Sequence, residues 1–327
     1  MLDSPIPPDV PATEQAVTVP VIAPPVLARP AERPPRVREV TVVAILALML
    51  AFATSACAGA VFGFAAAFSD PVRTRPRGNV VDNRIETLLS SPEFLIAAIL
   101  VTQAALLVVA FAATRSSRVA PREQLGLHAA RMSSAEWLLI VLATGWVATV
   151  SAGLPALAAF ALGQPFVPVD LYARLSPFGA AGWLAVVSIA PAICEELFFR
   201  GYVQRRLLRR TRPAKAIVYT SLIFAAFHLI PLQVVFTFLP GVWLGYLAWR
   251  TNSVWPGVIC HGALNFGWNL WFYLCVQWEL DATVQQVFMA ANILIGGIAL
   301  ALFARGRAAT VVELPAGPRD VRAMQPT

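Results

Sequence analysis

The chain has 327 residues, of which 58% are hydrophobic and only 13% charged, and its mean hydropathy is +0.67. Soluble domains are typically about 45–50% apolar and about 25% charged, so this composition excludes a soluble globular protein and predicts an integral membrane protein. The net charge of +7 comes from basic residues at the ends of apolar runs, which suits membrane orientation and argues against nucleic acid as a partner. The four cysteines show no CxxC spacing, so neither a zinc ribbon nor a disulfide framework is indicated.

The chain begins with a proline-rich stretch. Residues 1–39 contain ten prolines and no apolar periodicity, so they predict a disordered tail that contributes nothing to a core. Eight apolar runs follow, each close to the ~20 residues that a bilayer requires. The predicted fold is therefore an all-α, polytopic membrane bundle of about eight helices. The predicted spans are 40–68, 94–113, 135–160, 178–204, 214–229, 232–249, 254–276 and 284–303.

The loops predict the orientation of this bundle. Lys and Arg accumulate on the cytoplasmic side of membrane proteins. The loop after the fourth span is strongly basic, whereas the loop after the seventh offers only Glu279 and Asp281. We therefore expect a multi-pass protein of a plasma (inner) membrane with both termini cytoplasmic, and the Arg-rich composition suggests a bacterial source. The basic residues of the fourth loop are Arg205, Arg206, Arg209, Arg210, Arg212 and Lys215.

The fourth predicted span contains three charged residues, which are unusual inside a membrane-spanning helix. Glu195, Glu196 and Arg200 lie in an otherwise apolar run, and each charge at that depth costs at least ~2.5–3.5 kcal/mol by insertion scales. Glu196 and Arg200 are spaced i,i+4 and can pair along one helix face. Glu195 is then left over, with Pro191 one turn earlier loosening the backbone hydrogen bonds. This arrangement indicates a carboxylate held ready for proton transfer.

Two histidines fall at a similar depth on other spans. At ~1.5 Å per residue, Glu195 is about 15 Å from Arg205, His228 about 20 Å from Lys215, and His261 about 16 Å from Arg250. Phe224 with His228, and His261 with Asn265, are each spaced i,i+4 and so share a face. We expect Glu195 with His228 to deprotonate a water, and His261 with Asn265 to stabilise the oxyanion of a peptide carbonyl.

The motifs EELFFR, FAAFH and HGALN, which contain these residues, resemble the three signatures of the CPBP family of intramembrane proteases. Their patterns EExxxR, FxxxH and HxxxN occur here in order, within residues 183–271. The family includes CAAX prenyl endopeptidases and bacterial Abi proteins. The resemblance implies an eight-helix bundle open to the cytosol, in which Glu195 and His228 activate water while His261 and Asn265 form the oxyanion pocket. Its catalytic core would be residues 178–303, following N-terminal helices at 40–160 and preceding a cytoplasmic tail at 304–327. A peptide or membrane protein would enter from the cytoplasmic side.

Plainer interpretations of the same residues stay open. Glu196 and Arg200 can form a purely structural pair, or Arg200 can snorkel toward the cytoplasmic face. Each histidine can be a hydrogen-bonded core residue. Cys194 and Cys260 adjoin Glu195 and His261, but helix neighbours point about 100° apart, which argues against a thiol mechanism.

The class of function also has alternatives. Glu195, His228 and His261 would suffice as ligands for a catalytic zinc, yet there is no HExxH motif and Glu with His can activate water unaided, so no cofactor is favoured. A catalytically silent scaffold of the same fold, such as a bacteriocin-immunity protein, is the main alternative. A transporter that uses Glu195 as a proton site is disfavoured because no internal repeat stands out.

Overall fold

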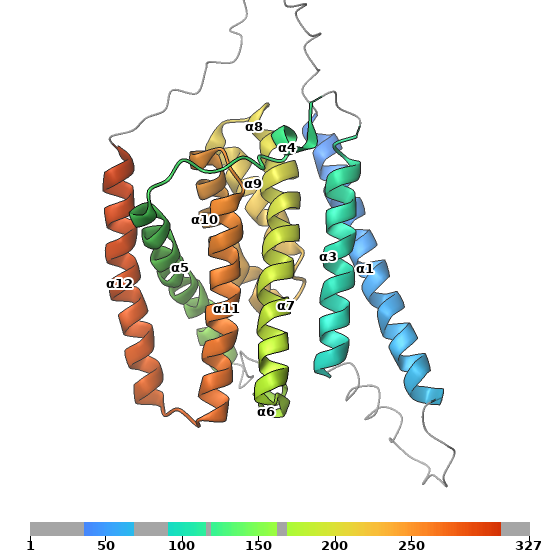
Figure 1. Cartoon of the computed structure of the whole chain (residues 1–327), viewed down its shortest axis with the longest axis vertical. Coiled ribbons are helices and arrows are strands. Elements are labelled where there is room, and N and C mark those ends of the chain that lie inside the picture. The colour runs from blue at the N-terminus through green and yellow to red at the C-terminus, as the bar shows by residue number, and fades with distance from the viewer. Residues whose placement is uncertain (1–35, 69–90, 116–118, 162–168, 309–327) are drawn as a thin grey trace, which may run out of the picture. The chain divides into compact units, whose positions relative to one another are not determined.

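The computed structural model describes residues 36–68, 91–115, 119–161 and 169–308, and Figure 1 shows how their helices are arranged. Across these ranges the regular structure is helical and contains no strand. By its contacts the chain divides into Met1–Arg33 and Pro34–Thr327, and every described residue belongs to the second unit. The predicted terminal tails and most of the loop between the first two predicted spans lie outside the described residues.

Six of the helices in these ranges are long and apolar enough to cross a membrane. The prediction of an all-α, polytopic membrane bundle is thereby confirmed. One of the six crossings is a continuous run of three consecutive elements, α7 (Pro177–Glu195), η1 (Glu196–Gln204) and α8 (Arg205–Leu208). The other five are α1 (Val37–Phe68), α3 (Pro92–Ala112), α5 (Ser134–Ala161), α10 (Pro231–Thr251) and α12 (Ala282–Ala308).

The two remaining predicted spans are also helices, but they differ from the six. Helix α9 (Pro213–Ala226) has only 14 residues, or about 21 Å of rise. It stops early because the chain turns before Pro231, passing through Leu229 at a φ of 58°. Helix α11 (Trp255–Gln277) has 23 residues, but its polar side chains make it less apolar than the six.

Serine and proline define where several helices begin. Ser91 accepts a hydrogen bond from the backbone N–H of Phe94 at the start of α3, and Ser176 does the same for Gly179 at the start of α7. Each is followed by a proline at the first helical position, where the missing N–H costs nothing. Proline also lies in the first turn of α9, α10 and α11. Two short helices, α4 (Pro121–Gln124) and α6 (Val169–Arg174), cover opposite ends of the bundle.

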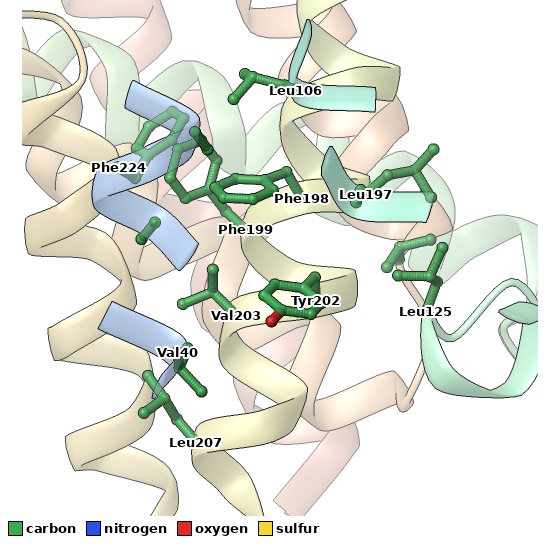
Figure 2. Close-up of a cluster of buried hydrophobic side chains, with 14 of the residues drawn as sticks. Val40, Leu106, Leu125, Leu197, Phe198, Phe199, Tyr202, Val203, Leu207 and Phe224 are labelled. Atoms are coloured by element: carbon green, nitrogen blue, oxygen red, sulfur yellow. The ribbon is translucent and has the colours of Figure 1, made fainter. Parts of the chain in front are cut away.

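The run from α7 to η1 lies at the centre of the packing. It contacts α3 and α11 along α7, and α3, α9, α10 and α11 along η1. The aromatic residues of η1 belong to one core cluster, and Figure 2 shows Phe198 and Phe199 close to Phe224 of α9. The ring of Phe199 meets those of Phe198 and Phe224 edge-on at 5.0 and 5.1 Å. This apolar cluster packs against η1, the element that also contains the charged residues Glu196 and Arg200.

The arginines after η1 form hydrogen bonds to residues at the ends of neighbouring helices. Arg205 donates to the carbonyl and side chain of Asn252, the C-cap of α10, at 3.2 and 2.7 Å. Arg206 donates to the carbonyl of Ala113, which follows α3, at 3.1 Å. In Figure 1 the start of α1 and the end of α12 lie at this same end of the bundle. We call it the Arg-rich end.

Candidate active site

Glu196 and Arg200 form a buried ion pair within η1. Arg200 Nη1 donates to Glu196 Oε1 at 2.6 Å, and both side chains are 0% exposed. Arg200 Nη2 donates to the carbonyl of Gly241 at 3.0 Å, and its guanidinium lies 4.4 Å above the ring of Phe224. The i,i+4 pair expected from the sequence is present, whereas the alternative that Arg200 snorkels to the surface is wrong, because every side of the guanidinium is covered.

Glu196 has a second partner that the sequence did not predict. His261 Nδ1 lies 3.0 Å from the same Oε1 that pairs with Arg200. The contact requires α11 to approach η1 closely, and Gly257 permits this: a Cβ there would lie 2.7 Å from Glu196 Oε2. The ionised carboxylate can only accept, so Nδ1 carries the hydrogen of this bond. Glu196 therefore fixes the orientation of the His261 ring.

Glu195 lies at the end of α7 with one oxygen engaged and one free. Gln103 Nε2 of α3 donates to Glu195 Oε1 at 2.8 Å. Glu195 Oε2 is 3.9 Å from His261 Nε2 and has no hydrogen-bond partner among the residues described. The side chain is 12% exposed. Two carboxylates and an imidazole from two helices thus converge, with the only free carboxylate oxygen of Glu195 facing His261.

His228 lies in the turn after α9 and contacts Phe224. Its Nδ1 is 3.1 Å from the carbonyl oxygen of Phe224, and its ring meets that of Phe224 edge-on at 5.1 Å. His261 also meets the Phe224 ring edge-on, at 5.9 Å. Both imidazoles therefore contact the ring of Phe224. Within the described chain no direct hydrogen bond joins His228 to Glu195.

Asn265 is held by a backbone group that a proline leaves free. Proline has no N–H, so Pro191 cannot bond to the carbonyl of Val187 four residues earlier. Asn265 Nδ2 donates to that carbonyl at 3.0 Å. Asn265 does not fix the tautomer of His261 one turn earlier, because Glu196 holds His261 Nδ1. The amide of Asn265 has a second N–H that this contact does not use.

A further polar cluster, which the sequence analysis missed, continues along α11 from Asn265. Asn269 Nδ2 donates to the carbonyl of Asn265 at 2.8 Å. Its Oδ1 accepts from Tyr172 of α6 at 2.7 Å and from Trp183 of α7 at 3.1 Å. Burial raises the pKa of Tyr172 to about 12, although its hydrogen bond with Trp183 acts in the opposite direction. The hydroxyl therefore stays protonated and bonds α6 to α11 at neutral pH.

Gln103 was also missed by the sequence analysis. The only available signal was a lone glutamine in the apolar run of α3, which carries no charge and no motif. As for a metal, no three His, Cys, Asp or Glu side chains in the described ranges are grouped so that they could hold an ion. Glu195, His228 and His261, the ligands considered for a catalytic zinc, form no such group as they are placed here.

Comparison with known proteins gave one family. Residues 177–267 match the family model described as type II CAAX prenyl endopeptidase Rce1-like. The matched segment is just over a quarter of the chain and contains every site residue predicted from the sequence, but it excludes Gln103, Tyr172 and Asn269. Searches of curated proteins and of solved structures each returned no significant match.

Proposed function

Since residues 177–267 carry an Rce1-like CAAX endopeptidase domain of the CPBP type, we propose that this chain hydrolyses a peptide bond within the membrane by means of Glu195, His228, His261 and Asn265. The observation that carries the proposal is the position of Glu195 Oε2. It is buried without a partner in the described chain and lies 3.9 Å from His261 Nε2. A carboxylate oxygen kept free beside an imidazole, away from bulk water, is suited to accept a proton from a nucleophilic water.

His228 can share this water with Glu195. The carbonyl of Phe224 is an acceptor only, so His228 Nδ1 carries a hydrogen and Nε2 is left as an acceptor. A water between Glu195 Oε2 and His228 Nε2 could then donate one hydrogen to each. Its lone pairs would remain directed at a substrate carbonyl. The roles expected from the motifs, with Glu195 as base and His228 as its partner, are compatible with this arrangement.

His261 and Asn265 supply the donors for the oxyanion. Glu195 and Glu196 carry two negative charges against the single positive charge of Arg200. A protonated His261 would balance the group, with Nδ1–H directed to Glu196 and Nε2–H available to the oxyanion. The second N–H of Asn265 is the other donor. Such preoriented donors in a dry site are among the largest contributions to acyl-transfer catalysis.

The reaction then balances without another reagent. The water oxygen forms a bond to the substrate carbonyl carbon, its proton passes to Glu195, and the carbonyl electron pair moves onto the oxygen held by His261 and Asn265. Collapse of this tetrahedral species breaks the C–N bond, and the departing amine takes the proton from Glu195. No step passes through a metal, because the residues do not form a suitable ligand set.

The substrate is proposed to be a peptide or membrane protein that reaches the site from the Arg-rich end. By the positive-inside rule, we place that end on the cytoplasmic side of a bacterial-type inner membrane, with both termini in the cytoplasm. Arg205 and Arg206 are bound to the ends of α10 and α3 at this end of the bundle. Basic residues there also suit contact with anionic lipid headgroups.

Cleavage of a quenched peptide library, prenylated and unprenylated, by detergent-purified protein tests the function. Glu195→Gln and His228→Ala should each lower kcat, the former by roughly 10²- to 10⁴-fold as expected for loss of a general base. Activity should survive a chelator. Loss in chelator with recovery on adding zinc would contradict the metal-independent mechanism. If no peptide were cleaved and no unprocessed partner accumulated on Glu195→Gln, the silent-scaffold alternative would replace the protease.

A further inference from the structure

Glu195 receives its hydrogen bond from outside the matched segment. Gln103 lies 92 positions earlier in the sequence, in α3, and donates from Nε2 to Glu195 Oε1 at 2.8 Å. Its side chain is buried, because α3 packs directly against α7. The endopeptidase motifs alone therefore do not complete the surroundings of the proposed base.

The amide of Gln103 has only one workable orientation. A carboxylate oxygen accepts hydrogen bonds, so the NH₂ group must face Glu195 and the carbonyl oxygen must point elsewhere. That oxygen, Gln103 Oε1, is buried and has no partner in the described parts of the chain. A buried acceptor without a donor destabilises a fold. Gln103 Oε1 and Glu195 Oε2 are thus two acceptors without a donor on side chains that are hydrogen-bonded to each other, and a ligand with N–H or O–H groups would satisfy both.

A neighbouring residue shows what a purely structural polar contact in the same helix looks like. Thr102, adjacent to Gln103, shares a hydrogen bond of 2.7 Å with Ser55 of α1. Neither hydroxyl is among the buried atoms that lack a partner. Both hydroxyls of the Thr102 contact have a partner within the protein, whereas the carbonyl oxygen of Gln103 has none in the described residues.

We propose that Gln103 is a positioning residue for Glu195 and that its carbonyl oxygen accepts a hydrogen bond from a backbone N–H of the bound peptide. The inference rests on the proposed function. The donated hydrogen bond holds Glu195 Oε1 and favours the ionised carboxylate, so that Oε2 stays available as the base. An extended peptide offers backbone N–H groups along its length, and one that reaches Glu195 Oε2 also passes Gln103.

Gln103→Met tests the proposal, because methionine keeps the length of the side chain and removes both polar atoms. We expect kcat to fall roughly 10- to 100-fold, the kinetic equivalent of one hydrogen bond to a charged group. KM should rise, and the acid limb of the kcat profile should move to higher pH, because the carboxylate has lost a hydrogen-bond donor. The melting temperature should change little, because the loss of the unpartnered Gln103 Oε1 offsets the loss of the donor to Glu195 Oε1. Thr102→Val is the matched control and should leave kcat and the pH profile unchanged.

Two results would overturn the proposal while leaving the protease in place. One is a Gln103→Met enzyme with the kcat and pH profile of the wild type. The other is a fall in kcat that follows a fall in melting temperature with the acid limb unmoved, which assigns Gln103 a structural role only.

Failure of the proposed function is distinguished by a measurement that needs no activity. Melting temperatures of Gln103→Met, Glu195→Met and the double variant form a cycle. Non-additive changes show that Gln103 holds Glu195 even if no peptide is cleaved. Additive changes overturn the pairing whether or not the wild type is a protease.

Discussion

Glu196 Oε1 accepts two hydrogen bonds, one from His261 Nδ1 at 3.0 Å and one from Arg200 Nη1 at 2.6 Å. One carboxylate oxygen thereby joins the buried cation to the imidazole. The two adjacent glutamates have different surroundings as a result. Each has one oxygen without a partner in the described chain. That of Glu196 lies against Gly257, whereas that of Glu195 lies 3.9 Å from His261 Nε2.

Breaking the Glu196–Arg200 pair from one side should destabilise the protein strongly. Arg200→Met leaves a charged Glu196 with no guanidinium in a buried site, which typically costs about 3–5 kcal/mol. The double variant Glu196→Met/Arg200→Met should recover much of this stability, because neither charge remains. It should nevertheless stay inactive, since His261 has lost its acceptor. Thermal unfolding in detergent and peptide cleavage measure the two effects. A single variant as stable as the wild type would show that the pair is unimportant for folding.

Adding one methyl group at Gly257 should disturb the same carboxylate. The new Cβ would lie 2.7 Å from Glu196 Oε2, and Arg200 and His261 prevent the carboxylate from moving aside. Overpacking of this kind costs about 1–3 kcal/mol, and we expect Gly257→Ala to lower kcat as His261 is displaced. Gly262→Ala on the same helix is the control, because its Cβ would meet no atom closer than 3.6 Å. Equal activity of the two variants would argue against tight packing at Glu196.

Tyr172 should make stability depend on alkaline pH. Burial raises its pKa from 10.0 to about 12, so above pH 10 the unfolded chain loses this proton while the folded protein keeps it. The stabilising contribution is therefore complete below pH 10 and is lost as pH rises toward 12. The difference in unfolding free energy between wild type and Tyr172→Phe should fall by about 1 kcal/mol from pH 10 to pH 11. Unfolding in detergent at pH 9, 10 and 11 measures it, and a difference that is constant over this range would refute the prediction.

The helices and the meeting of Glu195 with His261 could be predicted because their sequence signals are strong. A bilayer demands long apolar runs, and a charge inside such a run is costly enough to indicate a site. Counting residues from the basic loops then placed Glu195 and His261 at one depth, and the structure brings them within 3.9 Å.

The individual partners could not be predicted, because they depend on how helices pack. Pro191 predicts that the carbonyl of Val187 lacks its usual backbone donor, but nothing in the sequence indicates that Asn265 is the donor that replaces it. Gln103 is a neutral side chain whose link to Glu195 arises from the packing of α3 on α7. The π-helical form of Glu196–Gln204 has no sequence signature either, although such turns are frequent at functional sites.

The shortness of α9 has a consequence for the surrounding lipid. Its rise of about 21 Å is less than the ~30 Å hydrocarbon core of a typical bilayer, and His228 lies just beyond its last turn, beside the exposed Leu229 and Ile230. Hydrophobic mismatch of this size is relieved by local thinning of the bilayer. Longer acyl chains would bury the α9–α10 turn more deeply, and shorter ones would bring the hydrated headgroups closer to His228. Membrane thickness thus becomes a variable that controls how readily water reaches this histidine.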